Sequence, residues 1–294
     1  MNVRHNLSCL LGVLIAPTIL GAQSPACEGQ GSTVSPEVES TKITIVSVTF
    51  RGENPLSEED RDHLTKEIRH AKIHASAEDP DEKWVSEAGE TVRGSLQDRG
   101  YFRALVEIKP YLVRAEAHER LYAIDVEIDS GKQYRFGEIQ ISNGTVFSTS
   151  DLRKQVALGE AEIFDVSKVR EGLEAIGTLY GTKGYIDAVV EPEEKIQESK
   201  GQIDLVLRLD EGPQYHIGTV ESAGLDARAE ADARSVFEPG KVFDKRLWED
   251  FFQRNKSALP DGAPDRHASI RRDTRNGTVD IVLDFEPCSS ARSK

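Results

Sequence analysis

The sequence predicts an α+β fold of tandem β-α-α-β-β units, each a three-stranded mixed sheet covered on one face by two helices. Three observations predict it. The chain of 294 residues repeats its own motifs. In some segments apolar residues recur at four-residue spacing, which indicates helices with one buried face. In others apolar and polar residues alternate, which indicates strands with one buried face.

The repeats consist of short segments that match one another along the chain. Residues 129–139 match residues 210–220 at an Asp, two Gly, a Gln and a Tyr. Residues 99–110 match residues 183–194, and both begin with a basic residue, Gly and Tyr. A fainter third copy ends at residues 277–285. Together the copies predict three units of about 80 residues each.

Each unit opens with a strand and a first helix. We expect the opening strands at residues 43–50, 134–142 and 215–222. Ser57 and Ser148 are each followed three positions later by an acid, Asp60 and Asp151, which indicates a capping-box-like helix start.

Apolar stripes mark the second helices. They consist of Trp84, Ala88, Val92 and Leu96 in the first unit, and Val166, Val169, Leu173, Ile176 and Tyr180 in the second. Gly100 and Gly184 are expected to end these helices, because glycine adopts the left-handed backbone of a helix end without strain. Tyr101 and Tyr185 then start a strand and pack across the layer. Two alternating strands close each unit.

The chain divides into six predicted segments. They are a signal peptide at residues 1–22, a flexible linker at 23–41, units at 42–133, 134–213 and 214–288, and a tail at 289–294. The first segment has a basic start and a short apolar run interrupted by Pro17, as in a secretory signal. The third unit is degenerate, since residues 259–262 replace the Gly-Tyr pair.

Two cysteines remain after the signal peptide. Cys27 and Cys288 lie at opposite ends of an elongated chain, so we expect no disulfide, which requires Cα atoms within about 7 Å. Cys27 is either lipidated or a free or intermolecular thiol, and we favour the thiol.

The order of elements, with its helix–Gly-Tyr–strand junction, resembles the POTRA (polypeptide-transport-associated) domain. Residues 183–190 are similar to the family's Gly-Tyr motif with its following Ala and Val, and residues 99–106 match it as well. Residues 210–218 look like the family's turn into the next domain. The three units are therefore interpreted as POTRA-like domains.

The resemblance implies a function. In the family such domains form a periplasmic arm before an outer-membrane β-barrel, as in BamA-type assembly proteins. No series of long amphipathic strands follows Pro287, so we expect an arm without the barrel. It would act in the periplasm or at the periplasmic face of the outer membrane, contacting the membrane only through a partner. It would capture extended segments of outer-membrane or secreted proteins by β-strand addition, or dock to a separately encoded barrel. The alternative is a structural spacer or scaffold of an envelope complex without client binding.

The resemblance also places the binding strands at sheet edges, at residues 102–109 and 186–193. An open edge offers backbone amides and carbonyls to an extended peptide, whose alternate side chains add contacts. The expected contact residues are Phe102, Ala104, Val106, Ile108, Ile186, Ala188, Val189 and Val190.

Other chemistry is not expected. The net charge of -14 argues against nucleic acid, which needs a basic surface. The sequence has no Gly-x-Ser-x-Gly motif and no phosphate-binding glycine loop, because Gly137 and Gly218 are interpreted as junction turns. We therefore expect no enzymatic activity and no cofactor.

A histidine-rich helix offers one alternative. His63, Glu67, His70 and His74 would share one face of an ideal helix, and such side chains can hold Zn or Cu. The spacing is not His-Glu-x-x-His, so we favour a solvated helix face.

Overall fold

The structure, a computed structural model, describes residues 41–71, 73–75, 82–257, 259 and 268–285. The predicted signal peptide, the linker up to residue 40, both mature cysteines and the tail lie outside these residues. So does most of the 259–262 segment that replaces Gly-Tyr in the third unit.

The first unit has a four-stranded sheet in the order β2-β1-β4-β3. Its elements are β1 (Thr41–Glu53), α1 (Glu58–His70), β2 (Ile73–Ala75), α2 (Glu82–Gln97), β3 (Leu105–Ala115) and β4 (Glu119–Asp129). β1 runs parallel to the central β4, whereas β3 runs antiparallel to it, so the sheet is mixed. The short β2 pairs with the start of β1 and adds a strand that the sequence did not predict.

The second and third units have three-stranded sheets in the orders β5-β7-β6 and β8-β10-β9. The second comprises β5 (Arg135–Ser142), α3 (Thr149–Arg153), α4 (Val166–Gly181), β6 (Val189–Gln197) and β7 (Gln202–Asp210). The third comprises β8 (His216–Ala223), α5 (Ala227–Val236), α6 (Lys245–Asn255), β9 (Ala268–Asp273) and β10 (Thr278–Asp284). In both, the central strand pairs parallel with the first strand and antiparallel with the edge strand.

The predicted helices form where local signals place them. Ser57 accepts a hydrogen bond from the Asp60 amide and Asp60 accepts one from the Ser57 amide, so α1 begins with the expected capping box. Ser148 likewise accepts from the Asp151 amide at the start of α3. All nine residues of the two predicted stripes are buried, so amphipathic periodicity decides which helix face contacts each sheet.

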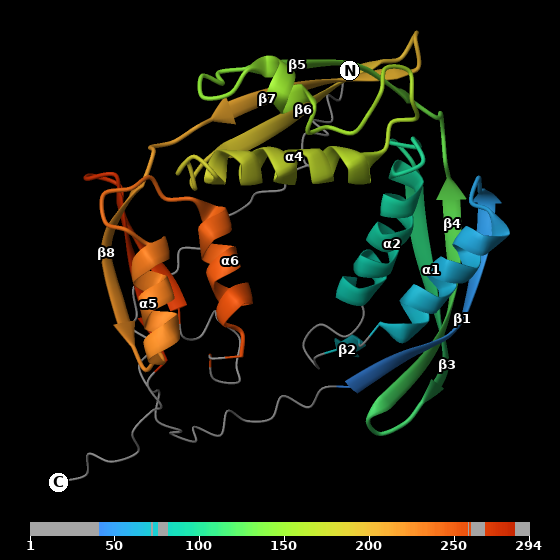
Figure 1. The fold of residues 1–294 in the computed structure, drawn as a ribbon. Coiled ribbons are helices and arrows are strands. Elements are labelled where there is room, and N and C mark those ends of the chain that lie inside the picture. The colour runs from blue at the N-terminus through green and yellow to red at the C-terminus, as the bar shows by residue number, and fades with distance from the viewer. Residues whose placement is uncertain (1–40, 72, 76–81, 258, 260–267, 286–294) are drawn as a thin grey trace.

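The units follow one another along an arc (Figure 1). The sheets lie on the outside of the arc, and α2, α4 and α6 face its inside. Each unit buries its own hydrophobic core. The α+β fold of tandem mixed sheets with helices is thus confirmed. Among the described residues, no helix combines the length and apolarity needed to cross a membrane.

Candidate functional site

Two strands, β3 and β6, lie at sheet edges beside a covered central strand. Within the described part of the chain, no strand pairs with their outer sides. Backbone amides and carbonyls on these sides are therefore available to an extended segment. The corresponding edge strand of the third unit, β9, is shorter and mostly polar.

β3 carries the four most exposed large apolar side chains of the described residues. Leu105 is 68% exposed, Tyr111 52%, Leu112 55% and Val113 60%. The last three lie in the half of β3 next to its hairpin, where every residue is exposed. Exposed large apolar residues clustered on one edge indicate a contact surface. These three residues lie beyond the predicted end of the strand at Lys109, because their consecutive apolar side chains do not continue the alternating pattern.

β6 is more acidic than β3. Glu191, Glu193 and Glu194 lie on it, and only Glu193 among them pairs with a cation, Arg208, in the described structure. Pro192 interrupts its row of backbone amides. Such a proline is tolerated on an edge strand where its missing N–H would face outward.

Hydrogen bonds at the β6–β7 turn show which β6 amides face outward. The Gly201 amide donates to the Gln197 carbonyl at 2.9 Å, so the Gln197 carbonyl points toward β7. The register between β6 and β7 is regular, and backbone groups alternate in direction along a strand. The amides of Val190, Glu194 and Ile196 therefore point away from β7. The backbone nitrogen of Pro192, which carries no hydrogen, faces the same way.

Four predicted contact residues lie before the strands, which is a correction. β3 begins at Leu105 and β6 at Val189, so Phe102, Ala104, Ile186 and Ala188 precede them. Ala104 and Ala188 close tight turns with Tyr101 and Tyr185, whose carbonyls accept their amides. Val106, Ile108, Val189 and Val190 do lie on the two edge strands.

Phe102 and Ile186 pack into the following unit instead of a free edge. Phe102 contacts Phe164 edge to face, with ring centroids 5.5 Å apart, and Phe164 is fully buried in the second core. Ile186 packs against the third core in the same way. Both side chains are partly buried, and alternation along a strand cannot show which unit covers such a side chain.

The Gly-Tyr positions join consecutive units. The Gly100 carbonyl accepts from the Tyr134 amide at 2.8 Å, and the Gly184 carbonyl accepts from the Tyr215 amide at 2.9 Å. Both glycines have positive φ, 84° and 81°. A Cβ on Gly184 would lie 2.6 Å from the Tyr215 carbonyl oxygen, so only glycine fits there without displacement.

The two junctions use ion pairs of opposite polarity. At the first, Arg103 pairs with Glu198 of the second unit, and the Tyr134 hydroxyl donates to Glu198 at 2.9 Å. At the second, Asp187 pairs with Arg272 of the third unit at 3.2 Å, and the Tyr215 hydroxyl donates to Asp187 at 2.6 Å. Arg103 and Asp187 occupy equivalent motif positions, so the acid and the base have exchanged units.

Gly137 and Gly218 are not junction turns, which is a second correction. They lie within β5 and β8, where the register with the central strand shifts at a β-bulge. Asp204 accepts from the Glu138 amide at 2.9 Å, and Asp280 accepts from the Thr219 amide at 2.7 Å. A Cβ on either glycine would collide with that carboxylate, so the bulge requires glycine.

Glu211 accepts hydrogen bonds from the loop between β5 and α3 and holds this loop in place. Burial opposes its ionisation, but hydrogen bonds from the Thr145 hydroxyl, the Val146 and Thr145 amides and the Tyr180 hydroxyl outweigh burial and lower its pKa to about 2. Burial and the bond to Glu211 raise the pKa of Tyr180. Glu211 therefore acts as a structural acceptor.

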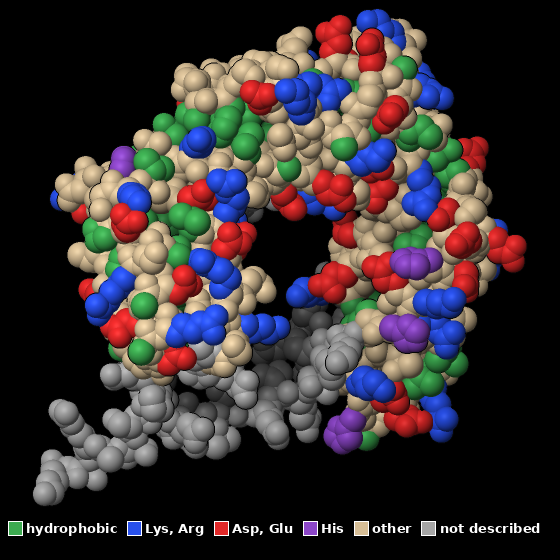
Figure 2. Space-filling view, viewed as in Figure 1, with side chains coloured by type: hydrophobic (Ala, Val, Ile, Leu, Met, Phe, Trp, Pro, Cys, Tyr) green, Lys and Arg blue, Asp and Glu red, His purple; other side chains and the backbone are tan. Residues whose placement is uncertain are grey.

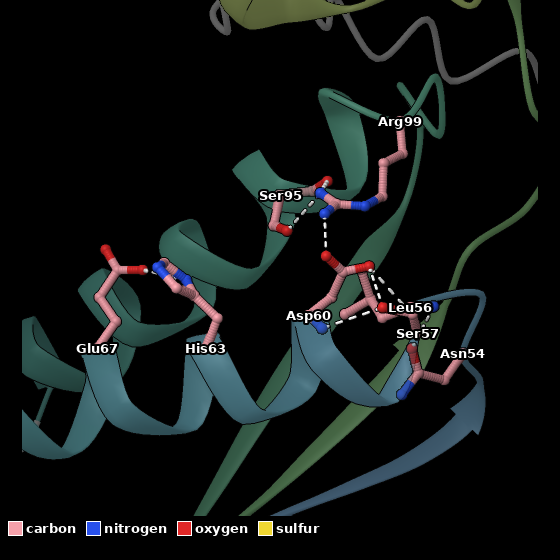
Figure 3. Close-up of polar contacts among 8 residues, drawn as sticks. All are labelled: Asn54, Leu56, Ser57, Asp60, His63, Glu67, Ser95 and Arg99. Carbon is pink, nitrogen blue, oxygen red and sulfur yellow. Dashed lines mark hydrogen bonds and ion pairs between the residues drawn. The ribbon is translucent and has the colours of Figure 1, made fainter.

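The basic residue before Gly100 is also structural. Arg99 donates to the Ser95 carbonyl at 2.8 Å and pairs with Asp60 (Figure 3), which links the end of α2 to the start of α1.

The candidate metal ligands do not converge. His63 lies 4.0 Å from Glu67 on the exposed face of α1 (Figure 3). α1 ends at His70 and His74 lies on β2, so the expectation that all four candidate ligands share one helix is wrong. Among the described side chains, no group of three potential metal ligands converges.

Comparisons with known proteins agree with this architecture. The family described as "POTRA: Surface antigen variable number repeat" matches residues 134–212. A Treponema pallidum (strain Nichols) protein named "Putative outer membrane protein assembly factor" is 25% identical over 206 residues, which cover 68% of this chain and 24% of that protein. "Outer membrane protein assembly factor BamA" of Neisseria meningitidis serogroup B is 23% identical over 180 residues, covering 56% of this chain and 23% of that protein. The chain thus spans about a quarter of the length of these relatives.

A solved structure shares the three-unit fold. The crystal structure of POTRA domains 3–5 of Haemophilus influenzae BamA is similar with a TM-score of 0.61 and 17% identity, covering 84% of this chain and 98% of that one. At this identity the likeness shows the fold alone.

Proposed function

We propose that this chain, whose residues 134–212 match the POTRA family, is a periplasmic binding module of outer-membrane protein assembly or secretion. It captures extended segments of outer-membrane or secreted proteins by strand addition. The observation that carries the proposal is the pair of edge strands, β3 and β6, which have unpaired outer sides in the described structure. Similarity to proteins named as outer-membrane assembly factors supports the pathway.

Recognition at these edges rests on the backbone. An added strand pairs its amides and carbonyls with those of the edge, and its alternate side chains contact the inward-facing side chains of the edge strand. Val106 and Ile108 on β3, and Val190 and Ile196 on β6, pack inward against their own cores and leave an apolar rim. Backbone pairing tolerates many sequences, which suits a protein with varied clients. No chemical step is required, so the proposed role is not enzymatic.

The alignment of β6 amides gives a direct test. Val190→Pro removes one outward amide without disturbing the pairing with β7, and Pro192→Val supplies an outward amide that the native strand lacks. Dissociation constants for a fluorescent peptide in which valine alternates with threonine would be measured by anisotropy. We expect Val190→Pro to weaken binding and Pro192→Val to tighten it, each by about threefold to tenfold, since one hydrogen bond contributes about 0.5–1.5 kcal/mol.

A urea-unfolded outer-membrane barrel protein serves as the natural client in the same assay. Unchanged affinity for both probes in both variants would rule out strand addition at β6. The equivalent pair at β3, Val106→Pro and Pro110→Val, tests the other edge. Circular dichroism confirms that each variant remains folded.

A spacer or scaffold is the second candidate function. The backbone hydrogen bonds at Gly100 and Gly184 and the ion pairs at each junction favour a fixed arrangement of units, which a spacer needs. A separately encoded barrel would then be the partner. Pull-down from an envelope extract discriminates the two roles, because recovery of assembly subunits that persists in the proline variants, with no client bound, would favour the spacer.

A further inference from the structure

Glu194 lies at an unusual place for a carboxylate. It pairs in register with Leu205, which is fully buried in the second core. Side chains alternate between faces along β6, so Glu194 shares the inward face with Val190 and Ile196, both packed against that core. The other two glutamates of β6, Glu191 and Glu193, lie on the opposite face by the same alternation.

The Glu194 carboxylate is incompletely satisfied. Its Oε1 atom is buried and has no hydrogen-bond partner among the described residues. Arg208, opposite the outward face, is already paired with Glu193. Burial raises the pKa of Glu194 above its ordinary value, its own backbone amide opposes the rise, and Glu193 adds to it. A buried carboxylate oxygen without a hydrogen-bond donor is costly, so native proteins pair such an atom with a cation or a donor.

We propose that Glu194 makes the β6 edge selective for segments that carry a Lys or Arg side chain beside it. The inference rests on the proposed strand addition at β6. In an added strand, the residue beside Glu194 on the inward face brings its side chain next to the Glu194 carboxylate, and its neighbours on that face meet Val190 and Ile196. The preferred client segment is thus apolar on one face with a single basic residue in the middle.

The other edge provides an internal contrast. The corresponding face of β3 consists of Val106, Ile108, Pro110 and Leu112, none of which is charged. β3 therefore favours fully apolar faces, and the two edges of one molecule select different segments of a client.

Three matched peptides test the inference. Each alternates valine with threonine, and the central valine is kept, replaced by lysine or replaced by glutamate. We expect the unmodified protein to bind the lysine peptide about tenfold more tightly than the valine peptide, as a charge-assisted bond predicts. Glu194→Gln, which keeps the shape of the side chain, should abolish this preference and leave the affinity for the valine peptide within about twofold. Glu194→Lys should transfer the preference to the glutamate peptide.

The outcomes separate the two proposals. Equal binding of valine and lysine peptides by the unmodified protein, with both weakened by Val190→Pro, overturns the Glu194 inference while strand addition stands. A lysine preference that persists in Glu194→Gln also overturns it. If none of the peptides binds, or if Val190→Pro has no effect, strand addition at β6 fails first. Loss of the preference in Glu194→Gln, with valine-peptide binding retained, supports both.

Discussion

At the residue scale, the glycines of the repeated motif do more than end helices. Gly184 combines a positive φ of 81° with a carbonyl that accepts the first amide of the next unit. Its missing side chain lets the Tyr215 backbone approach closely. The same position therefore sets both the direction of the chain and the distance between units.

Gly184→Ala should destabilise the second junction by about 1–3 kcal/mol, because a non-glycine residue is strained in the left-handed region. Hydrogen exchange of the Tyr215 amide, which donates to Gly184, would report the loss directly. Gly177→Ala is the matched control, since it lies in α4 with open space at its Cβ position. That change should leave the Tyr215 amide protected and stabilise α4 by about 0.5–1 kcal/mol. Equal Tyr215 exchange in both variants would contradict the role assigned to Gly184.

At the element scale, one carboxylate, Glu211 directly after β7, joins the loop that follows β5 to α4. Loops without apolar cores of their own depend on such acceptors. The corresponding position in the first unit is Ser130, which is buried but cannot accept as many bonds. The stabilisation of this loop by a carboxylate therefore distinguishes the second unit from the first.

Glu211 predicts the direction in which the stability of this loop depends on pH. Its pKa falls from 4.5 to about 2 on folding, so its contribution is present above its unfolded value and disappears as pH falls through its folded value. Glu211→Gln should cost about 1–2 kcal/mol at neutral pH, since the group is partly solvated. Urea unfolding of both proteins at a series of pH values should show this difference shrinking between about pH 5 and pH 2. A constant difference across that range would show that Glu211 is not ionised through it.

The sequence predicts local features of these elements better than relations between them. The stripe from Trp84 to Leu96 follows from helical periodicity alone, because one turn determines which face is apolar. Phe102 and Ile186 were assigned to free edges because alternation shows that a side chain is buried but not which core buries it. The Gly137 bulge depends on Asp204 across the sheet, and no local pattern reveals such a partner. The burial of Glu194 and the junction ion pairs cannot be predicted for the same reason, because each is a single charge within a highly charged chain.

At the scale of the whole molecule, the arc depends on two junctions with the same backbone contacts and different charges. Figure 2 shows an opening at the centre of the arc, with charged side chains on its rim. Backbone hydrogen bonds at Gly100 and Gly184 fix the approach of each following unit. The ion pairs flank these bonds. The carboxylate of each pair also accepts a hydrogen bond from a tyrosine hydroxyl, that of Tyr134 at the first junction and that of Tyr215 at the second.

Exchanging the charges at the second junction tests its contribution. Asp187→Arg removes the acceptor of Tyr215 and places two cations together, so the junction should loosen. Adding Arg272→Asp should recover about 0.5–1 kcal/mol, as expected for a partly exposed pair. Small-angle scattering and urea unfolding of the single and double variants provide the cycle. The same exchange at Glu193 and Arg208, within one unit, should leave the scattering profile unchanged. An Asp187→Arg variant with unaltered scattering and stability would refute the role of the pair.

Because the acid and the base exchange places between the two junction ion pairs, the junction charges favour the native order of the three units. A second unit followed by a copy of itself would bring Asp187 against Glu198, and the first unit followed directly by the third would bring Arg103 against Arg272. Either arrangement opposes like charges at a contact that the native order makes attractive. The junction charges therefore disfavour both wrong orders of the units relative to the native order.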